Sequence, residues 1–113
     1  MHELSLVNSI LDQLEEISRS NYDRKIVRVD LKVGALEHIE PEVLKNIFDQ
    51  VKEGSCAERA ELVVSQEMAL VRCRNCMMEY TPEDSIWICP RCEFLGGEII
   101  KGTEIIIESV YLE

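Results

Sequence analysis

The chain has 113 residues, 46% of them hydrophobic, and a formal net charge of −10. This length allows one domain, or one small domain with a smaller module, and the hydrophobic content argues against a disordered chain. The negative charge disfavours binding to nucleic acid or to an anionic membrane surface, because both attract proteins through Lys and Arg.

Residues 3–20 are predicted to form an amphipathic helix, because apolar side chains recur at three- and four-residue steps. These side chains are Leu4, Val7, Ile10, Leu11, Leu14 and Ile17. From Ile26 the period changes to two, which predicts a strand that is buried on one face and ends at Gly34. Its apolar residues are Val27, Val29, Leu31 and Val33, and its polar residues are Arg28, Asp30 and Lys32.

A second helix is predicted to begin at Pro41, because the first turn of a helix tolerates a residue without an N–H. Gly54 is a natural stop for this helix. Its apolar stripe consists of Val43, Leu44, Ile47, Phe48 and Val51. Residues 62–71 are rich in strand-forming side chains and predict one or two further strands.

The segment from Arg72 to Gly97 differs from the rest, with four cysteines, two prolines and too few aliphatic residues for a core of its own. Strand-forming residues return after it. The predicted fold class is α+β, a small mixed sheet with two helices that carries an inserted zinc-ribbon module. We expect a main domain of residues 1–70, completed by a terminal strand of residues 99–113, and a zinc-ribbon module of residues 71–98.

The four cysteines form two Cys-x-x-Cys pairs, Cys73 with Cys76 and Cys89 with Cys92, separated by twelve residues. Each pair places two thiolates on one side of a tight turn, and two facing pairs give the tetrahedral sulfur shell that zinc prefers. Four thiolates leave no open position for water, so the zinc is expected to be structural. The alternatives are two disulfides, or a thioredoxin-type redox pair that would explain only one of the two motifs.

The cellular compartment affects whether the paired cysteines bind zinc or form disulfides. The first twenty residues mix Glu, Asp and Gln with apolar residues, unlike a secretory signal, and no stretch approaches the roughly 20 apolar residues of a membrane span. We therefore expect a cytoplasmic protein, in which thiols stay reduced and disulfides are disfavoured. Cys56, outside both motifs, is interpreted as a spectator thiol.

Three other functional interpretations compete with a metal-handling role. A zinc ribbon often contacts nucleic acid, and Arg72, Arg74 and Arg91 give local positive charge, but the rest of the chain opposes this. The chain can also be read as a zinc-ribbon interaction or regulatory protein. An enzyme is not expected, because we find no set of nucleophile, base and acid and no glycine-rich phosphate loop.

The amino terminus, Met1-His2-Glu3, leads directly into the first predicted helix. Met1 and its amine are expected to persist, because His2 is too large for removal of the initiator methionine. The first N–H groups of a helix have no intrahelical acceptor, so the amine, two amide nitrogens and the His2 imidazole are close together and uncommitted. Such a square-planar nitrogen set suits Ni(II) or Cu(II). The alternative is that His2 is a frayed, solvated terminal residue.

Several motifs in this order resemble one family. They are Met1-His2-Glu3 before an amphipathic helix, Val33-Gly34 followed by Ile39-Glu40-Pro41-Glu42, and paired Cys-x-x-Cys motifs before a short β-rich tail. The combination covers essentially the whole chain and is similar to the HypA/HybF family of hydrogenase nickel-incorporation proteins.

The resemblance implies a nickel metallochaperone that delivers Ni(II) to the large subunit of nickel–iron hydrogenase together with a HypB-type GTPase. Some members of the family also serve urease maturation. By the family's pattern, Met1, His2 and Glu3 hold nickel and the four paired cysteines hold zinc. Glu40 matches an acidic position implicated in nickel binding in some members, and His38 is a second candidate contact, although a solvated loop histidine is the competing interpretation. A monomer or weak homodimer is expected.

Overall fold

The computed structural model describes residues 3–83 and 86–113, and its contacts divide the chain into two compact units. The helical unit comprises Met1–Lys32, Ile39–Ser65 and Ile105–Glu113. The cysteine unit comprises Val33–His38 and Gln66–Glu104. No helix among the described residues is long and apolar enough to cross a membrane.

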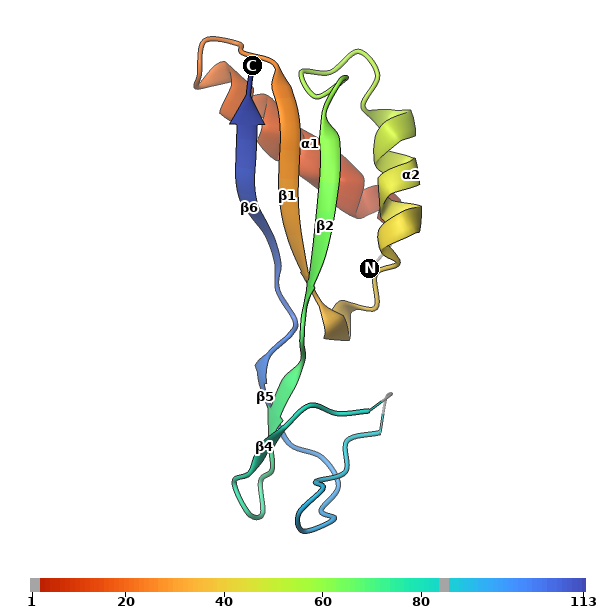
Figure 1. Cartoon of the computed structure of the whole chain (residues 1–113), viewed down its shortest axis with the longest axis vertical. Coiled ribbons are helices and arrows are strands. Elements are labelled where there is room, and N and C mark those ends of the chain that lie inside the picture. Colours follow the sequence, from red (N-terminus) through yellow and green to blue (C-terminus); the bar gives the residue numbers. More distant parts are fainter. Residues whose placement is uncertain (1–2, 84–85) are drawn as a thin grey trace. The chain divides into compact units, whose positions relative to one another are not determined.

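The helical unit consists of two helices and a three-stranded sheet. The helices are α1 (Glu3–Arg19) and α2 (Pro41–Val51), and they pack against each other. The strand order is β2 (Glu61–Glu67), β1 (Ile26–Gly34), β6 (Ile105–Leu112). Figure 1 shows α1 crossing one face of this sheet and α2 beside β2. The chain passes from β1 through α2 into a parallel β2, whereas β6 runs antiparallel to β1, so the sheet is mixed, as the sequence predicts.

The core of the helical unit lies between α1, α2 and the sheet. Its fully buried large side chains are Val7, Ile10, Leu14, Ile26, Val29, Leu31, Leu44 and Phe48. These residues confirm the centres of the three predicted apolar stripes. The stripe margins were predicted wrongly, because Leu4, Val27, Val43 and Val51 are exposed. Each predicted apolar stripe is wider than the face of the helix or strand that the packed elements of the unit cover.

The turn after α1 is held by hydrogen bonds that cap the last turn of the helix. Ser18 is 3% exposed, and its Oγ donates to the carbonyl oxygen of Arg24 at 2.7 Å. The Asn21 side-chain amide donates to the carbonyl of Ile17 at 2.7 Å. These bonds direct the chain from α1 toward β1, through Tyr22 and Asp23, both of which have left-handed backbone angles.

Replacing Ser18 with alanine is expected to lower the free energy of unfolding of the helical unit by about 1 kcal/mol, because the hydrogen bond from the buried Ser18 hydroxyl to the Arg24 carbonyl is lost. Urea unfolding followed by circular dichroism at 222 nm measures this loss. Ser20→Ala, at an exposed neighbouring position, is the matched control and should change stability little. Equal effects of the two substitutions would contradict a role for the Ser18 hydroxyl.

The cysteine unit contains a second small sheet with the order β4 (Glu79–Tyr80), β3 (Leu70–Arg72), β5 (Glu98–Lys101). Both pairings are antiparallel. Residues 62–71, predicted as one or two strands, therefore supply β2 to one sheet and β3 to the other. The β-rich tail is likewise divided, because β5 pairs with β3 while β6 joins β1. The predicted division into a nickel-binding and a zinc-ribbon domain stays a prediction, because a compact unit need not be a functional domain.

Candidate metal centre

The first Cys-x-x-Cys turn begins where β3 ends. The backbone N–H of Cys73 donates to the carbonyl of Met78 at 2.8 Å, and the N–H of Met77 donates back to the Cys73 carbonyl at 3.0 Å. Met77 has a φ of 67°, which is the left-handed conformation that closes the turn. These bonds fold the segment so that the Cys73 and Cys76 side chains lie on one side of it.

The second turn repeats the same bonds. Cys89 N–H donates to the carbonyl of Phe94 at 3.0 Å, and Glu93 N–H donates to the Cys89 carbonyl at 2.9 Å. Glu93, with a φ of 64°, takes the place that Met77 has in the first turn. The two motifs are therefore two copies of one backbone knuckle, although nothing in the sequence marks Met77 and Glu93 as left-handed residues.

The sulfur atoms accept hydrogen bonds from the backbone of each knuckle. The N–H groups of Asn75 and Cys76 lie 3.4 and 3.5 Å from the Cys73 Sγ. In the second knuckle, the N–H of Arg91 lies 3.4 Å from the Cys89 Sγ. Such donors stabilise negative charge on sulfur, and thiolates are the form in which cysteine binds zinc.

The four sulfurs converge from the two knuckles. The Sγ atoms of Cys73 and Cys92 are 3.6 Å apart, those of Cys76 and Cys89 are 3.5 Å apart, and all four lie within 4.8 Å of one another. A tetrahedral zinc site with Zn–S bonds of about 2.3 Å requires sulfur–sulfur distances of about 3.8 Å. The spacing and the donor type therefore fit a zinc ion. None of the four cysteines forms a disulfide.

The four thiols lie close together, and the pKa values of Cys92 and Cys76 shift in opposite directions. Hydrogen bonds from the Asn75 side-chain amide and from the Phe94 backbone lower the pKa of Cys92 to about 6. The Met78 backbone lowers the pKa of Cys76, but burial and the neighbouring thiols outweigh it and raise that pKa to about 11. Four thiolates cannot share this volume without a cation, and a bound dication supplies the missing charge.

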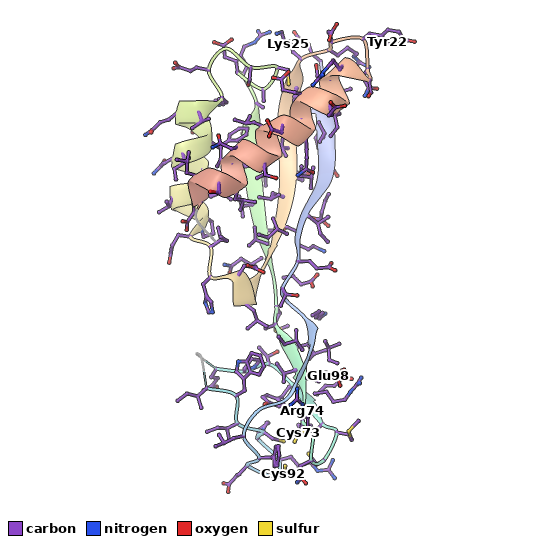
Figure 2. The ribbon with its side chains drawn as sticks, turned by 180° about the vertical axis from the view of Figure 1, so that it is seen from behind. Tyr22, Lys25, Cys73, Arg74, Cys92 and Glu98 are labelled. Atoms are coloured by element: carbon purple, nitrogen blue, oxygen red, sulfur yellow. The ribbon has the colours of Figure 1, made fainter. Side chains whose placement is uncertain are left out.

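The site is also the core of its unit. Cys73 and Cys89 are fully buried with Val71, and Tyr80 packs with them at 7% exposure. Trp87 and Met78 are partly buried against this cluster. Figure 2 shows Cys73 and Cys92 among the side chains of this unit. Within the described residues, these four cysteines are the group of metal-ligating side chains close enough to hold one ion.

Only some of the predicted nickel residues lie in the described part of the chain. Met1 and His2 lie outside the described residues. Glu3 begins α1 and is half-buried. Glu40 is exposed at the N-cap of α2 and makes no side-chain capping bond, and His38 is exposed in a left-handed conformation. The assignment of these residues to nickel therefore stays a prediction.

Two side chains near the cysteines could not be identified from the sequence. Asn75 reaches across to the Sγ of Cys92 at 3.5 Å, and Trp87 packs on the cysteine core. Residue spacing reveals neither contact, because both join one knuckle to another part of the fold. Cys56 lies in the helical unit, where it is 8% exposed and its N–H donates to the Glu15 carboxylate at 3.1 Å. Burial, and next the Glu15 carboxylate, raise the pKa of the Cys56 thiol.

Comparison with known proteins agrees with this arrangement. The HypA family model, described as hydrogenase/urease nickel incorporation, metallochaperone, matches residues 1–112. The hydrogenase maturation factor HypA of Aquifex aeolicus is 35% identical over 113 residues, covering 100% of this chain and 98% of that protein. The HypA of Desulfitobacterium hafniense (strain DSM 10664 / DCB-2) is 34% identical, covering 100% of this chain and 99% of that protein.

Solved structures show the same fold. The solution structure of the Ni metallochaperone HypA from Helicobacter pylori superposes with a TM-score of 0.71 at 25% identity, covering 99% of this chain and 97% of that one. A second solution structure of a HypA protein gives a TM-score of 0.71 at 26% identity. These matches confirm the α+β fold and the resemblance that the motifs indicate. The chain belongs to the HypA family of hydrogenase and urease nickel-incorporation metallochaperones.

Proposed function

We propose that this chain carries Ni(II) at its amino terminus for hydrogenase maturation, while its four paired cysteines hold a structural zinc ion. The observation that carries the proposal is the match to the HypA family over residues 1–112. The sulfur cluster supports the zinc part, because its spacing fits one tetrahedral ion. When bound, zinc would hold the two knuckles together, and its full thiolate shell gives it no catalytic position.

The proposed nickel ligands are the terminal amine of Met1, the amide nitrogens of His2 and Glu3, and the His2 imidazole. The start of α1 at Glu3 supports this set, because the first N–H groups of a helix lack intrahelical acceptors. A nitrogen set of this kind suits the square-planar preference of Ni(II) and disfavours zinc. The two metals would therefore be sorted by donor type, nitrogen for nickel and sulfur for zinc.

Glu40 is proposed as a further nickel contact. It is the N-cap residue of α2, its side chain makes no capping hydrogen bond, and α2 packs against α1. Its carboxylate therefore makes no capping hydrogen bond to its own helix that nickel binding would have to break. His38 is a weaker candidate, since its exposed position is equally that of a solvated loop histidine.

Transfer requires release as well as binding. A ligand set at the end of a chain can leave its metal geometry without unfolding the helical core, which begins at the first buried residue, Leu6. We propose that a HypB-type GTPase promotes this transfer in the cytoplasm and that the hydrogenase large subunit receives the nickel. Urease maturation proteins are a second class of recipient, in line with the family description.

The decisive measurement is calorimetric titration of the zinc-loaded chain with Ni(II). We expect about one nickel per chain, with binding lost in His2→Ala because one of the four proposed nitrogen ligands is removed. Adding two residues before Met1 should also abolish binding, because the amine moves out of reach. His38→Ala changes the other histidine of the sequence and tests the weaker candidate, and a loss much smaller than that of His2→Ala would assign the imidazole ligand to His2.

Zinc content measured in parallel distinguishes loss of nickel binding from loss of the fold. Full nickel binding by His2→Ala would place the nickel site elsewhere. Absence of nickel binding in the unaltered chain would leave a zinc-ribbon interaction module as the better account.

A further inference from the structure

A groove in the helical unit lies apart from the proposed metal ligands. It encloses about 450 Å³ between α2 and the segment that leads into β2. Lys45, Asp49 and Lys52 line it from α2, and residues 59–63 line it from the other side. None of these residues has a role in the proposed function.

One wall of this groove is an open strand edge. The order β2-β1-β6 leaves β2 with β1 on one side and no strand on the other among the described residues. An edge strand presents unpaired N–H and C=O groups, which proteins usually protect with Lys, Pro or a bulge within the strand, or by covering the edge with a helix or loop. Here α2 lies across the groove from this edge, so an added strand would have to enter the groove to pair with β2. The sequence of β2, ELVVSQE, contains neither Lys nor Pro. The edge is therefore able to pair with an added strand.

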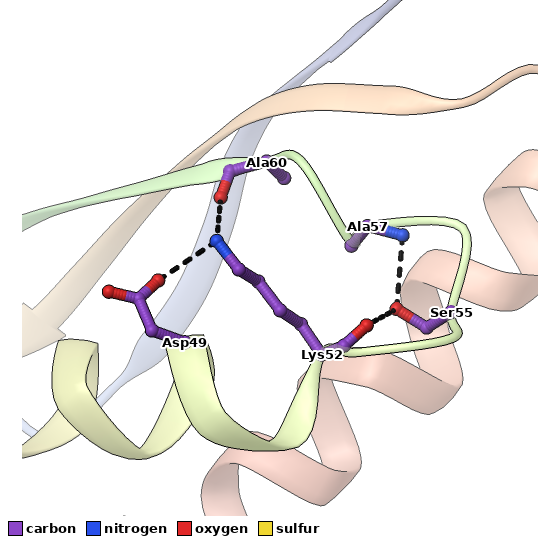
Figure 3. Close-up of polar contacts among 5 residues, drawn as sticks. All are labelled: Asp49, Lys52, Ser55, Ala57 and Ala60. Atoms are coloured by element: carbon purple, nitrogen blue, oxygen red, sulfur yellow. Dashed lines mark hydrogen bonds and ion pairs between the residues drawn. The ribbon is translucent and has the colours of Figure 1, made fainter.

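The opposite wall is held in place by Lys52. Its Nζ donates to the carbonyl oxygen of Ala60 at 2.9 Å and pairs with Asp49 at 2.9 Å, as Figure 3 shows. Ser55 Oγ donates to the Lys52 carbonyl at 2.6 Å and accepts from the Ala57 N–H at 3.1 Å. These bonds fix the carboxyl end of α2 to the start of β2, so the groove exists before any partner binds.

The two other cations of the groove have weak partners. Lys45 lies 3.9 Å from Glu42, whose side chain is 84% exposed, and Arg59 lies 3.3 Å from Glu113. Exposed pairs of this kind contribute about 0–1 kcal/mol, so both cations can change partner at little cost. The groove lining holds three cations and two acidic residues, whereas the whole chain has 12 Lys and Arg against 22 Asp and Glu.

We propose that this groove binds an extended, acidic segment of a partner protein, which pairs with the open edge of β2 and places carboxylates near Lys45 and Arg59. The strand edge would supply main-chain hydrogen bonds, and the two cations would select acidic side chains. A second copy of this chain fits less well, because two chains of charge −10 repel each other. The inference does not depend on nickel binding, so either can fail alone.

The probe is an eight-residue synthetic peptide that alternates Glu and Val, titrated into the zinc-loaded chain and followed by amide NMR shifts. We expect shifts confined to β2 and α2, with slower hydrogen exchange along β2. The double variant Lys45→Glu and Arg59→Glu should bind on the order of tenfold more weakly. Arg19→Glu with Lys25→Glu makes the same change in net charge at exposed positions outside the groove, and should bind like the unaltered chain.

Besides a control with phosphate, four results would overturn the proposal. They are the absence of shifts in β2, equal binding of a peptide that alternates Lys and Val, equal weakening in the two double variants, and shifts at β2 that depend on protein concentration without peptide. The last result would assign the edge to a second copy. Inorganic phosphate tested alone is the remaining control, and if it reproduced the peptide's shifts, the groove would be an anion pocket that does not pair with a strand.

Discussion

Replacing Cys73 with serine is expected to abolish zinc binding and unfold the cysteine unit while the helical unit stays folded. The small core of the cysteine unit consists of Val71, Tyr80 and two of the four cysteines, so it contains little apolar surface without the metal. Structural zinc contributes about 10–16 kcal/mol to the folding of small metal-dependent modules. The helical unit has its own core between α1, α2 and the sheet, and we expect it to persist.

The chain offers a separate reporter for each unit. Trp87 is the only tryptophan in the sequence, and it packs against the cysteine core. Its emission should shift to longer wavelength when the zinc site is lost. Both α-helices belong to the helical unit, so circular dichroism at 222 nm should stay close to that of the unaltered chain. A chelator strong enough to remove zinc should give the same pair of signals.

Cys56→Ala is the matched control, because it removes a buried thiol that belongs to the other unit. This variant should keep one zinc per chain and the native Trp87 emission. Retention of zinc and of native emission by Cys73→Ser would show that Cys73 is not a ligand. Loss of the helical signal together with the Trp87 shift would show that the two units fold as one.

Local pattern was enough to predict most of the elements. The apolar period of 3.6 residues located α1, and Pro41 marked the start of α2. The change to a period of two located β1, which begins at Ile26 and ends at Gly34 as predicted. Each of these signals is carried by neighbouring residues, so one sequence is sufficient to read it.

Which strands pair with each other in the two sheets could not be predicted in this way. Alternation shows that residues 62–71 and the tail are extended, but it contains no information on which strand lies beside them. The chain leaves the first sheet after β2, enters the second with β3 and returns with β6. The open edge of β2 and its groove follow from that pairing, so they could not be predicted from the sequence.

The zinc ligands could be predicted from the sequence, whereas the hydrogen bonds that surround them could not. The spacing of Cys73, Cys76, Cys89 and Cys92 is set by the chemistry of one tetrahedral ion, so it appears directly in the sequence. The hydrogen bond from Asn75 to the Cys92 sulfur depends on how the two knuckles face each other. Glu3, Glu40 and His38 remain predictions for nickel, because their role rests on family resemblance and a terminal motif.

Replacing Gly34 with alanine is expected to destabilise the cysteine unit by about 3 kcal/mol or more, through a steric clash. A Cβ atom at Gly34 would lie 2.1 Å from the carbonyl oxygen of Gly102 and 2.7 Å from the Thr103 nitrogen. Both contacts are with backbone, which cannot rotate away as a side chain can. Two hydrogen bonds cross the same contact, from Gly34 N–H to the Glu104 carbonyl at 2.7 Å and from Leu36 N–H to the Gly102 carbonyl at 2.9 Å.

The test separates this clash from the ordinary cost of losing a glycine. Gly34 has a φ of −65°, which alanine adopts freely, so its cost is purely steric. Gly96→Ala is the matched control in the same unit, because Gly96 has a φ of +89° and open space around its Cβ position, giving a conformational cost of about 1 kcal/mol. Unfolding in urea, followed by Trp87 emission, should show the larger loss for Gly34→Ala, with faster hydrogen exchange at Leu36. A smaller loss than that of Gly96→Ala would mean that residues 102–104 do not press on Gly34 in solution.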